Sequence, residues 1–105
     1  MAENWQAAGA AGEVTEETPL SARVAGKDIG VYLCKGSYYA LEDICPHAHA
    51  LLSQGFVEGE EIECPLHGAR FHIPSGRCTR DPAERDVRVY PVKIEGGTVY
   101  VDVSE

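Results

Sequence analysis

Apolar and polar residues alternate along short stretches of this chain, and glycine or proline separates one stretch from the next. The clearest case is residues 98–103, where Val99, Val101 and Val103 alternate with more polar neighbours, as in a strand with one buried face. No segment sustains the helical period of about 3.6 residues. The pattern predicts an all-β fold, an antiparallel sandwich or barrel of short strands.

Hairpins account for most of the predicted strands. Glycine marks their turns at Gly26-Lys27, near Gly59-Glu60 and at the pair Gly96-Gly97, a two-glycine loop that suits a tight hairpin. The predicted strand segments are 20–26, 27–36, 38–44, 56–64, 87–95 and 98–103. Pro91 lies inside one of them, which indicates a sheet edge or a bulge because proline has no backbone N–H to donate.

Residues 43 to 82 differ from the rest of the chain, because they hold all four histidines and two Cys–His pairs. We interpret them as two metal-binding loops joined by a small hairpin, forming a subdomain inserted into a basal β framework. The whole chain, residues 1–105, is then one domain. A domain of this size has a modest hydrophobic core, so a metal centre would add to its stability.

The two pairs follow the patterns Cys-x-His, for Cys45 and His47, and Cys-x-x-His, for Cys64 and His67, with a proline after each cysteine. Any one of these side chains alone would be an ordinary loop residue, but two proline-backed pairs favour a metal centre. Two kinds remain open: a Zn²⁺ site with two sulfur and two nitrogen ligands, or a [2Fe–2S] cluster with cysteines on one iron and histidines on the other. One Cys and one His from each loop is unusual for a zinc finger and suits the cluster.

The segment CPHAHALLSQGFVEGEEIECPLHGARFHIPSGR resembles the cluster-binding region of Rieske-type ferredoxins, the electron carriers of bacterial aromatic-ring-hydroxylating oxygenase systems. The resemblance implies the Rieske fold, in which antiparallel β-sheets carry a small cluster-binding subdomain at one end. It also implies one Rieske [2Fe–2S] cluster per chain. Cys45 and Cys64 would bind the buried iron, and His47 and His67 the iron near the surface.

The same resemblance implies a function without catalysis. A ferredoxin of this kind takes one electron from a flavoprotein reductase and delivers it to a terminal oxygenase. Docking is therefore expected to be transient, and the chain is expected to be a monomer. Two alternatives stay open: a zinc-binding interaction module, and the Rieske-like small subunit of an assimilatory nitrite reductase, which would stay bound to its large partner.

Two departures from the respiratory branch of the Rieske family bear on the site. The cysteines that form a disulfide there are replaced here by Ala50 and Leu66, so no bridge between the loops is expected. The serine and tyrosine hydroxyls that face the cluster sulfurs there are replaced by Ala69 and Phe71. Because hydrogen bonds to sulfur stabilise the reduced cluster, their absence predicts a potential near the low end of the Rieske span of roughly −150 to +300 mV.

The net charge and the composition limit which binding partners and which cell compartment suit the chain. The formal net charge is −8, from 17 acidic and 9 basic side chains, so the surface repels nucleic acid and anionic membranes. The N-terminal segment lacks the basic start and apolar run of a secretory signal, and no segment is long and apolar enough to span a membrane. We therefore expect a cytoplasmic protein with reduced thiols, which suits metal ligation better than disulfides.

Other chemistry-bearing residues receive simpler interpretations. His49 is interpreted as a polar loop residue beside the ligand His47, and His72 as a surface histidine. Cys34 is interpreted as a small buried apolar residue, and Cys78 is given no role. Leucines near the two loops are expected to shield the cluster from water, and Gly68 is expected to allow close approach of the backbone to it.

An acidic run lies beside the second Cys–His pair, in the hairpin segment 56–64. It is interpreted as a solvated hairpin, with electrostatic steering toward a basic partner as the alternative. Its members are Glu58, Glu60, Glu61 and Glu63.

Overall fold

The computed structural model describes residues 3–44, 50–65, 68–80 and 86–104. In this part of the chain, short β-strands form three antiparallel sheets, and the only helices are two single 3-10 turns, η1 (Ala11–Glu13) and η2 (Leu52–Gln54). The predicted all-β, antiparallel class is therefore confirmed. No helix in these ranges is long and apolar enough to cross a membrane.

The first sheet has the strand order β1-β11-β10, with β1 at Trp5–Ala10, β11 at Thr98–Asp102 and β10 at Val92–Glu95. The hairpin of β10 and β11 turns at the predicted glycine pair, and both glycines have positive φ. Strand β1 was not predicted from the sequence. Its residues, WQAAGA, are mostly small, so they carry little of the β-branched alternation that identifies a strand.

The second sheet has the order β2-β3-β4-β9. Its strands are β2 (Leu20–Val24), β3 (Lys27–Cys34), β4 (Ser37–Glu42) and β9 (Val89–Tyr90). The first hairpin turns through residues 25 and 26, one residue earlier than predicted. Pro91 separates β9 from β10, and these strands lie at the edges of two different sheets. The proline therefore marks the point where the chain crosses from one sheet to the other.

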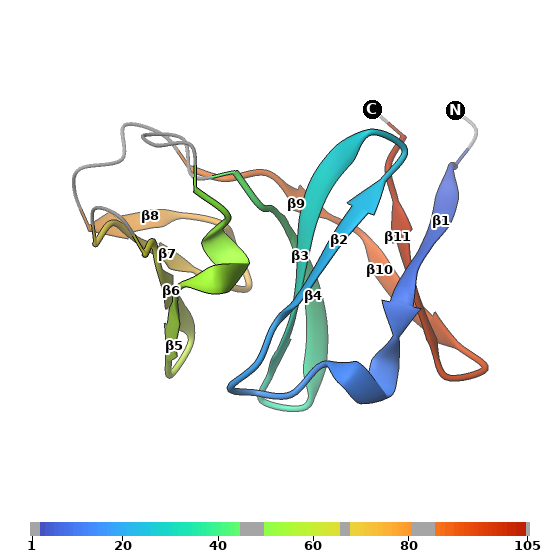
Figure 1. Ribbon diagram of the computed structural model, residues 1–105, viewed down its shortest axis with the longest axis horizontal. Coiled ribbons are helices and arrows are strands. Elements are labelled where there is room, and N and C mark those ends of the chain that lie inside the picture. The colour runs from blue at the N-terminus through green and yellow to red at the C-terminus, as the bar shows by residue number, and fades with distance from the viewer. Residues whose placement is uncertain (1–2, 45–49, 66–67, 81–85, 105) are drawn as a thin grey trace.

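The third sheet, called here the small sheet, has the order β5-β6-β7-β8. Its strands are β5 (Phe56–Glu58), β6 (Glu61–Glu63), β7 (Arg70–His72) and β8 (Cys78–Arg80). The predicted turn at Gly59 joins β5 to β6. In Figure 1 the small sheet lies on one side of the second sheet, and β1, β10 and β11 lie on the other. The first and second sheets together are called the basal framework below.

Strand β3 lies at the centre and is buried on both faces. Ile29 and Val31 belong to an apolar cluster shared with β11, whereas Tyr32 and Cys34 belong to a second cluster shared with the small sheet. This alternation follows from the period of two in a strand. Cys34 is 5% exposed, as expected of a small buried residue. The second cluster connects the basal framework to the region of the predicted ligands.

Candidate metal centre

Of the four predicted ligands, the structure describes Cys64. The other three, Cys45, His47 and His67, lie outside the described residues, as does His49. What the structure does describe is the protein on either side of the ligands. The segments called here the first loop, residues 44–51, and the second loop, residues 64–69, are each closed at their base by described contacts.

Cys64 directly follows β6 and is buried, with 1% of its surface exposed. Its backbone N–H donates to the carbonyl of Ala69 over 2.7 Å, and its carbonyl accepts from the N–H of Gly68 over 3.2 Å. These two bonds close the second loop where β6 ends and β7 begins. Gly68 has a φ of +75°, a conformation that other residues rarely adopt. A Cβ there would meet Glu63 Oε2 at 3.7 Å, so the backbone conformation, not crowding by described atoms, explains the glycine.

The sulfur of Cys64 lies in apolar surroundings. Leu52, Ala69 and Phe71 are each 0% exposed and belong to the same apolar cluster as Cys64. The cysteine is a free thiol. A buried cysteine offers a soft sulfur donor, which fits an iron–sulfur cluster and equally a zinc ion. The side chains of Ala69 and Phe71 carry no hydroxyl, so neither side chain can donate a hydrogen bond to a sulfur nearby.

An arginine on the outer face of the small sheet pairs with the acidic run. Arg70 lies 3.0 Å from Glu63, 2.7 Å from Glu58 and 3.3 Å from Glu61, and the glutamates raise its pKa, with Glu58 contributing most. Glu60 instead pairs with Lys35 and His72, and the hydrogen bond from Lys35 is the main cause of its lowered pKa. The prediction of a merely solvated hairpin is therefore incomplete, because ion pairs neutralise part of this charge.

The base of the first loop is closed by backbone contacts. Ile44 and Leu51 form an isolated antiparallel bridge. The N–H of Leu52, the first residue of η2, donates to the carbonyl of Asp43 over 2.6 Å. On its other side, the N–H of Asp43 donates to the carbonyl of Asp28 in β3 over 2.9 Å. Asp43 thus lies between the basal framework and the far end of the loop.

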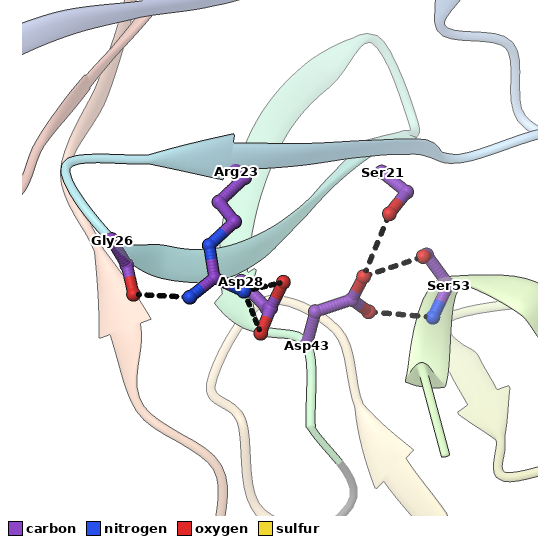
Figure 2. A network of polar contacts seen from close by, with 6 residues as sticks. All are labelled: Ser21, Arg23, Gly26, Asp28, Asp43 and Ser53. Carbon is purple, nitrogen blue, oxygen red and sulfur yellow. Dashed lines mark hydrogen bonds and ion pairs between the residues drawn. The ribbon is translucent and has the colours of Figure 1, made fainter.

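The side chain of Asp43 makes a second set of contacts and is 0% exposed (Figure 2). Its carboxylate accepts from the N–H and the hydroxyl of Ser53, both over 2.7 Å, and from the hydroxyl of Ser21 over 3.3 Å. Burial raises the pKa of Asp43, and the hydrogen bonds from Ser53 act in the opposite direction. Asp43 was not singled out from the sequence, because its partners Ser21 and Ser53 lie 22 and 10 positions away along the chain.

The remaining candidates have structural partners. His72 contacts Ser75 through Nδ1 at 2.8 Å and Glu60 through Nε2 at 3.1 Å, so it lies at the surface as expected. Cys78 is half-buried, and its N–H donates to Asp86. Within the described ranges, no three Cys, His, Asp or Glu side chains gather closely enough to hold a metal ion. That part of the chain therefore offers no second metal centre.

The chain is similar to known proteins over most of its length. The profile of the Rieske [2Fe-2S] domain family matches residues 4–91. The ferredoxin component of the naphthalene 1,2-dioxygenase system of Pseudomonas aeruginosa is 43% identical over 104 residues, which cover 99% of this chain and 100% of that protein. The structure of the Sphingomonas yanoikuyae B1 ferredoxin superposes with a TM-score of 0.90 at 29% identity, covering 96% of this chain and 100% of that chain.

Two further structures bear on the alternatives. A chain of the complex of reduced oxygenase and oxidized ferredoxin in carbazole 1,9a-dioxygenase has a TM-score of 0.84 at 34% identity, over 93% of this chain and 92% of that one. A structure described as an NADH-dependent nitrite reductase small subunit from Mycobacterium tuberculosis has a TM-score of 0.86 at 20% identity, over 100% and 99% of the chains. At that identity the second likeness shows a shared fold alone.

Proposed function

The chain belongs to the Rieske [2Fe-2S] domain family, and we propose that it is the ferredoxin component of an aromatic-ring-hydroxylating dioxygenase system. It is an electron carrier with a Rieske-type [2Fe–2S] cluster, and its relatives are carriers rather than the catalytic oxygenases. The observation that carries the proposal is the end-to-end match, at 43% identity, to a ferredoxin component of such a system.

The proposed ligands are Cys45 and Cys64 for one iron, and His47 and His67 for the other. The burial of Cys64 among apolar side chains supports its place on the inner iron. We also propose that residues 1–105 form one domain in which residues 43–82 are the cluster-binding subdomain. Support comes from the small sheet, which lies within that range and pairs with neither basal sheet.

A bound [2Fe–2S] cluster would accept and release one electron. The chain's own residues set the conditions for this exchange. Cys64 and its apolar neighbours exclude water from one side of the site. Ala69 and Phe71 withhold the hydroxyl groups that would favour the reduced form, which predicts a low potential. A low potential suits a carrier that receives electrons from a flavoprotein and passes them to an oxygenase.

The partners proposed are a flavoprotein reductase and the terminal oxygenase, with the chain acting as a cytoplasmic monomer that docks transiently on each. The complex of oxygenase and ferredoxin in a related system supports the second partner. The net charge of −8 favours basic docking faces and disfavours nucleic acid. Exchange with two partners in turn requires weak binding, which a small interface provides.

Electron paramagnetic resonance of the dithionite-reduced protein tests the ligand set. Replacing any of Cys45, His47, Cys64 or His67 by alanine should abolish or change the cluster signal. Cys34→Ala is the matched control, because Cys34 is also buried, at 5% exposed, but is not a proposed ligand. A Cys64→Ala variant with an unchanged signal would contradict the assignment.

Reconstitution tests the function itself. Product formation by a naphthalene-type oxygenase and its flavoprotein reductase should depend on added protein. A protein that carries zinc and no acid-labile sulfide would instead indicate the interaction module. Stable co-purification with a large reductase would indicate the nitrite reductase subunit.

A further inference from the structure

Asp43 connects three segments that are separate in the sequence. Its N–H reaches Asp28 in β3, its carboxylate reaches Ser21 in β2, and its carbonyl and carboxylate together reach η2 through Leu52 and Ser53. Figure 2 shows the carboxylate between Ser21 and Ser53. The first two contacts fix Asp43 to the basal framework, and the others fix the end of the first loop to Asp43.

The arrangement around this carboxylate is specific. Burying a carboxylate is costly unless hydrogen bonds compensate, and here Ser53, itself 8% exposed, supplies two of them over 2.7 Å. On the side of β3, Gly30 leaves space for the carboxylate of Asp43. A Cβ at Gly30 would lie 3.0 Å from Asp43 Oδ1 and 3.1 Å from the hydroxyl oxygen of Tyr32. Glycine at this position therefore lets a charged group lie beneath a buried strand.

The position of these contacts connects them with the cluster. Asp43 and Ser53 stand at the two ends of the segment 44–52, which contains Cys45 and His47. Besides the bridge between Ile44 and Leu51, three hydrogen bonds join the two ends, and all three run from Leu52 or Ser53 to Asp43. A loop whose two ends are held together, and held to a rigid sheet, has fewer conformations to lose when it binds a metal.

We propose that Asp43 is a positioning residue: its hydrogen bonds to Ser53 and Leu52 clamp the first loop to the basal framework and hold Cys45 and His47 in the geometry that the cluster requires. The inference rests on the proposed function, because it takes these two residues as ligands. Asp43 would act through the loop and not as a ligand.

Three variants remove different numbers of the hydrogen bonds that Asp43 makes. Asp43→Ala removes every side-chain bond, and Ser53→Ala removes one while keeping the N–H of Ser53. Asp43→Asn keeps an oxygen for that N–H, and its amide group can donate to the hydroxyls of Ser53 and Ser21. Retention of the cluster against an iron chelator should fall by roughly 10- to 100-fold in Asp43→Ala, the range seen when a residue supporting a metal ligand is removed. It should fall less in Ser53→Ala and least in Asp43→Asn.

The spectrum of the reduced protein supplies a readout that stability alone would not move. Asp43→Ala should broaden or shift the paramagnetic resonance signal, and Asp43→Asn should restore it. Asp102→Ala is the matched control, because Asp102 is 7% exposed and accepts from the N–H and the hydroxyl of Ser104 in the same way, but in the basal framework. Its signal should match wild type.

The outcomes separate the two proposals. A normal wild-type signal that Asp43→Ala and Ser53→Ala leave unchanged would overturn the clamp and spare the proposed function. Equal loss of the cluster in Asp102→Ala would also overturn it, because the effect would then reflect general stability. If Asp43→Ala fails to fold, the other two variants decide the question. The proposal then requires that Ser53→Ala retain the cluster less well than wild type and that Asp43→Asn retain it nearly as well as wild type. A wild-type protein without a [2Fe–2S] signal would overturn both.

Discussion

The two loops that carry the predicted ligands are closed at their bases in different ways. The second loop is closed by the small sheet itself, through the bond between Cys64 and Ala69 and the pairing of β6 with β7. The first loop follows β4 and returns to a 3-10 turn. One isolated backbone bridge and one backbone hydrogen bond close its base, and the buried carboxylate of Asp43 supplies the other contacts. Local strand pairing closes the base of one loop, and contacts made by Asp43 close the base of the other.

The difference has a consequence for how the site responds to change. A ladder distributes its hydrogen bonds over several residues, so the loss of one side chain is tolerated. A clamp centred on one carboxylate concentrates them, and its loss leaves buried polar groups without partners. The first loop should therefore be more sensitive to single substitutions than the second.

The largest effect is expected where the end of η2 lies against the end of β6. A Cβ at Gly55 would lie 1.8 Å from the carbonyl oxygen of Glu63, so Gly55→Ala must force η2 away from the end of β6. Because backbone cannot yield as a flexible side chain does, the loss should be about 3 kcal/mol or more. Urea unfolding measures it. Gly12→Ala is the control, because a Cβ there meets nothing within 4 Å, and an equal loss in both variants would contradict the steric account.

Gly68→Ala separates backbone strain in the second loop from its effect on the ligands. The positive φ predicts a loss of about 1–2 kcal/mol in the free energy of unfolding. Gly59→Ala, in the turn of the β5–β6 hairpin, carries a similar φ of +61° and should cost a similar amount. Only Gly68→Ala should also weaken cluster retention, because it lies within the second loop. Equal retention in the two variants would show that the loop tolerates strain.

The low potential predicted from Ala69 and Phe71 is tested by restoring a hydroxyl. A serine hydroxyl in Ala69→Ser could donate a hydrogen bond to the cluster. If this bond is about 1.4 kcal/mol stronger to the reduced cluster than to the oxidised cluster, the reduction potential should rise by about 60 mV. Redox titration by visible absorbance measures the shift. Ala40→Ser, at another buried alanine in the basal framework, should leave the potential unchanged. A shift of the same size in Ala40→Ser would refute the hydrogen-bond explanation.

The ion pairs outside the second loop should matter little. Arg70 and Glu63 keep 25% and 27% of their side chains exposed, and pairs of this kind contribute about 0–1 kcal/mol. Arg70→Met should therefore leave the cluster signal and its retention near wild type. Losses as large as those of Asp43→Ala would mean that the second loop also depends on a single side chain, and the contrast between the loops would fail.

The smallest effect concerns Asp102, the buried aspartate of the basal framework. Hydrogen bonds, above all the one from the hydroxyl of Ser104, lower the pKa of Asp102 in the folded protein. The ionised carboxylate therefore stabilises the fold at a pH above the unfolded pKa of about 3.9. This stabilisation is lost as the pH falls through the lower pKa of the folded protein. Asp102→Asn should thus be less stable than wild type at pH 7, with a difference that shrinks below about pH 4. The urea midpoint reported by Trp5, which pairs with Asp102, measures this. A difference independent of pH would contradict it.

Features of the fold that depend on residues close together in the sequence could be predicted, whereas features that depend on distant residues could not. The hairpins at Gly59 and at Gly96-Gly97 were predicted correctly, because turn residues and alternation lie within a few positions. Strand β1 was missed, because its small residues become a strand only by pairing with β11 at the other end of the chain. Long-range pairing of this kind leaves no periodic pattern to detect.

The candidate site shows the same division. The segment around the two Cys–His pairs resembles the Rieske family, and the match of the family profile to residues 4–91 confirms that resemblance. The partners of the acidic run were not foreseen, because Arg70 faces Glu63 only through the register of β6 and β7. The role of Asp43 likewise appears only when Ser21 and Ser53 are seen to converge on it.

The most direct test of the central claim is nitrogen hyperfine spectroscopy on the dithionite-reduced protein, prepared with ¹⁵N-labelled histidine. The account predicts a [2Fe–2S] signal with couplings to two histidine nitrogens, one of them lost in each of His47→Cys and His67→Cys. A cluster signal without histidine couplings, or a protein that contains zinc and no paramagnetic signal at all, would contradict it.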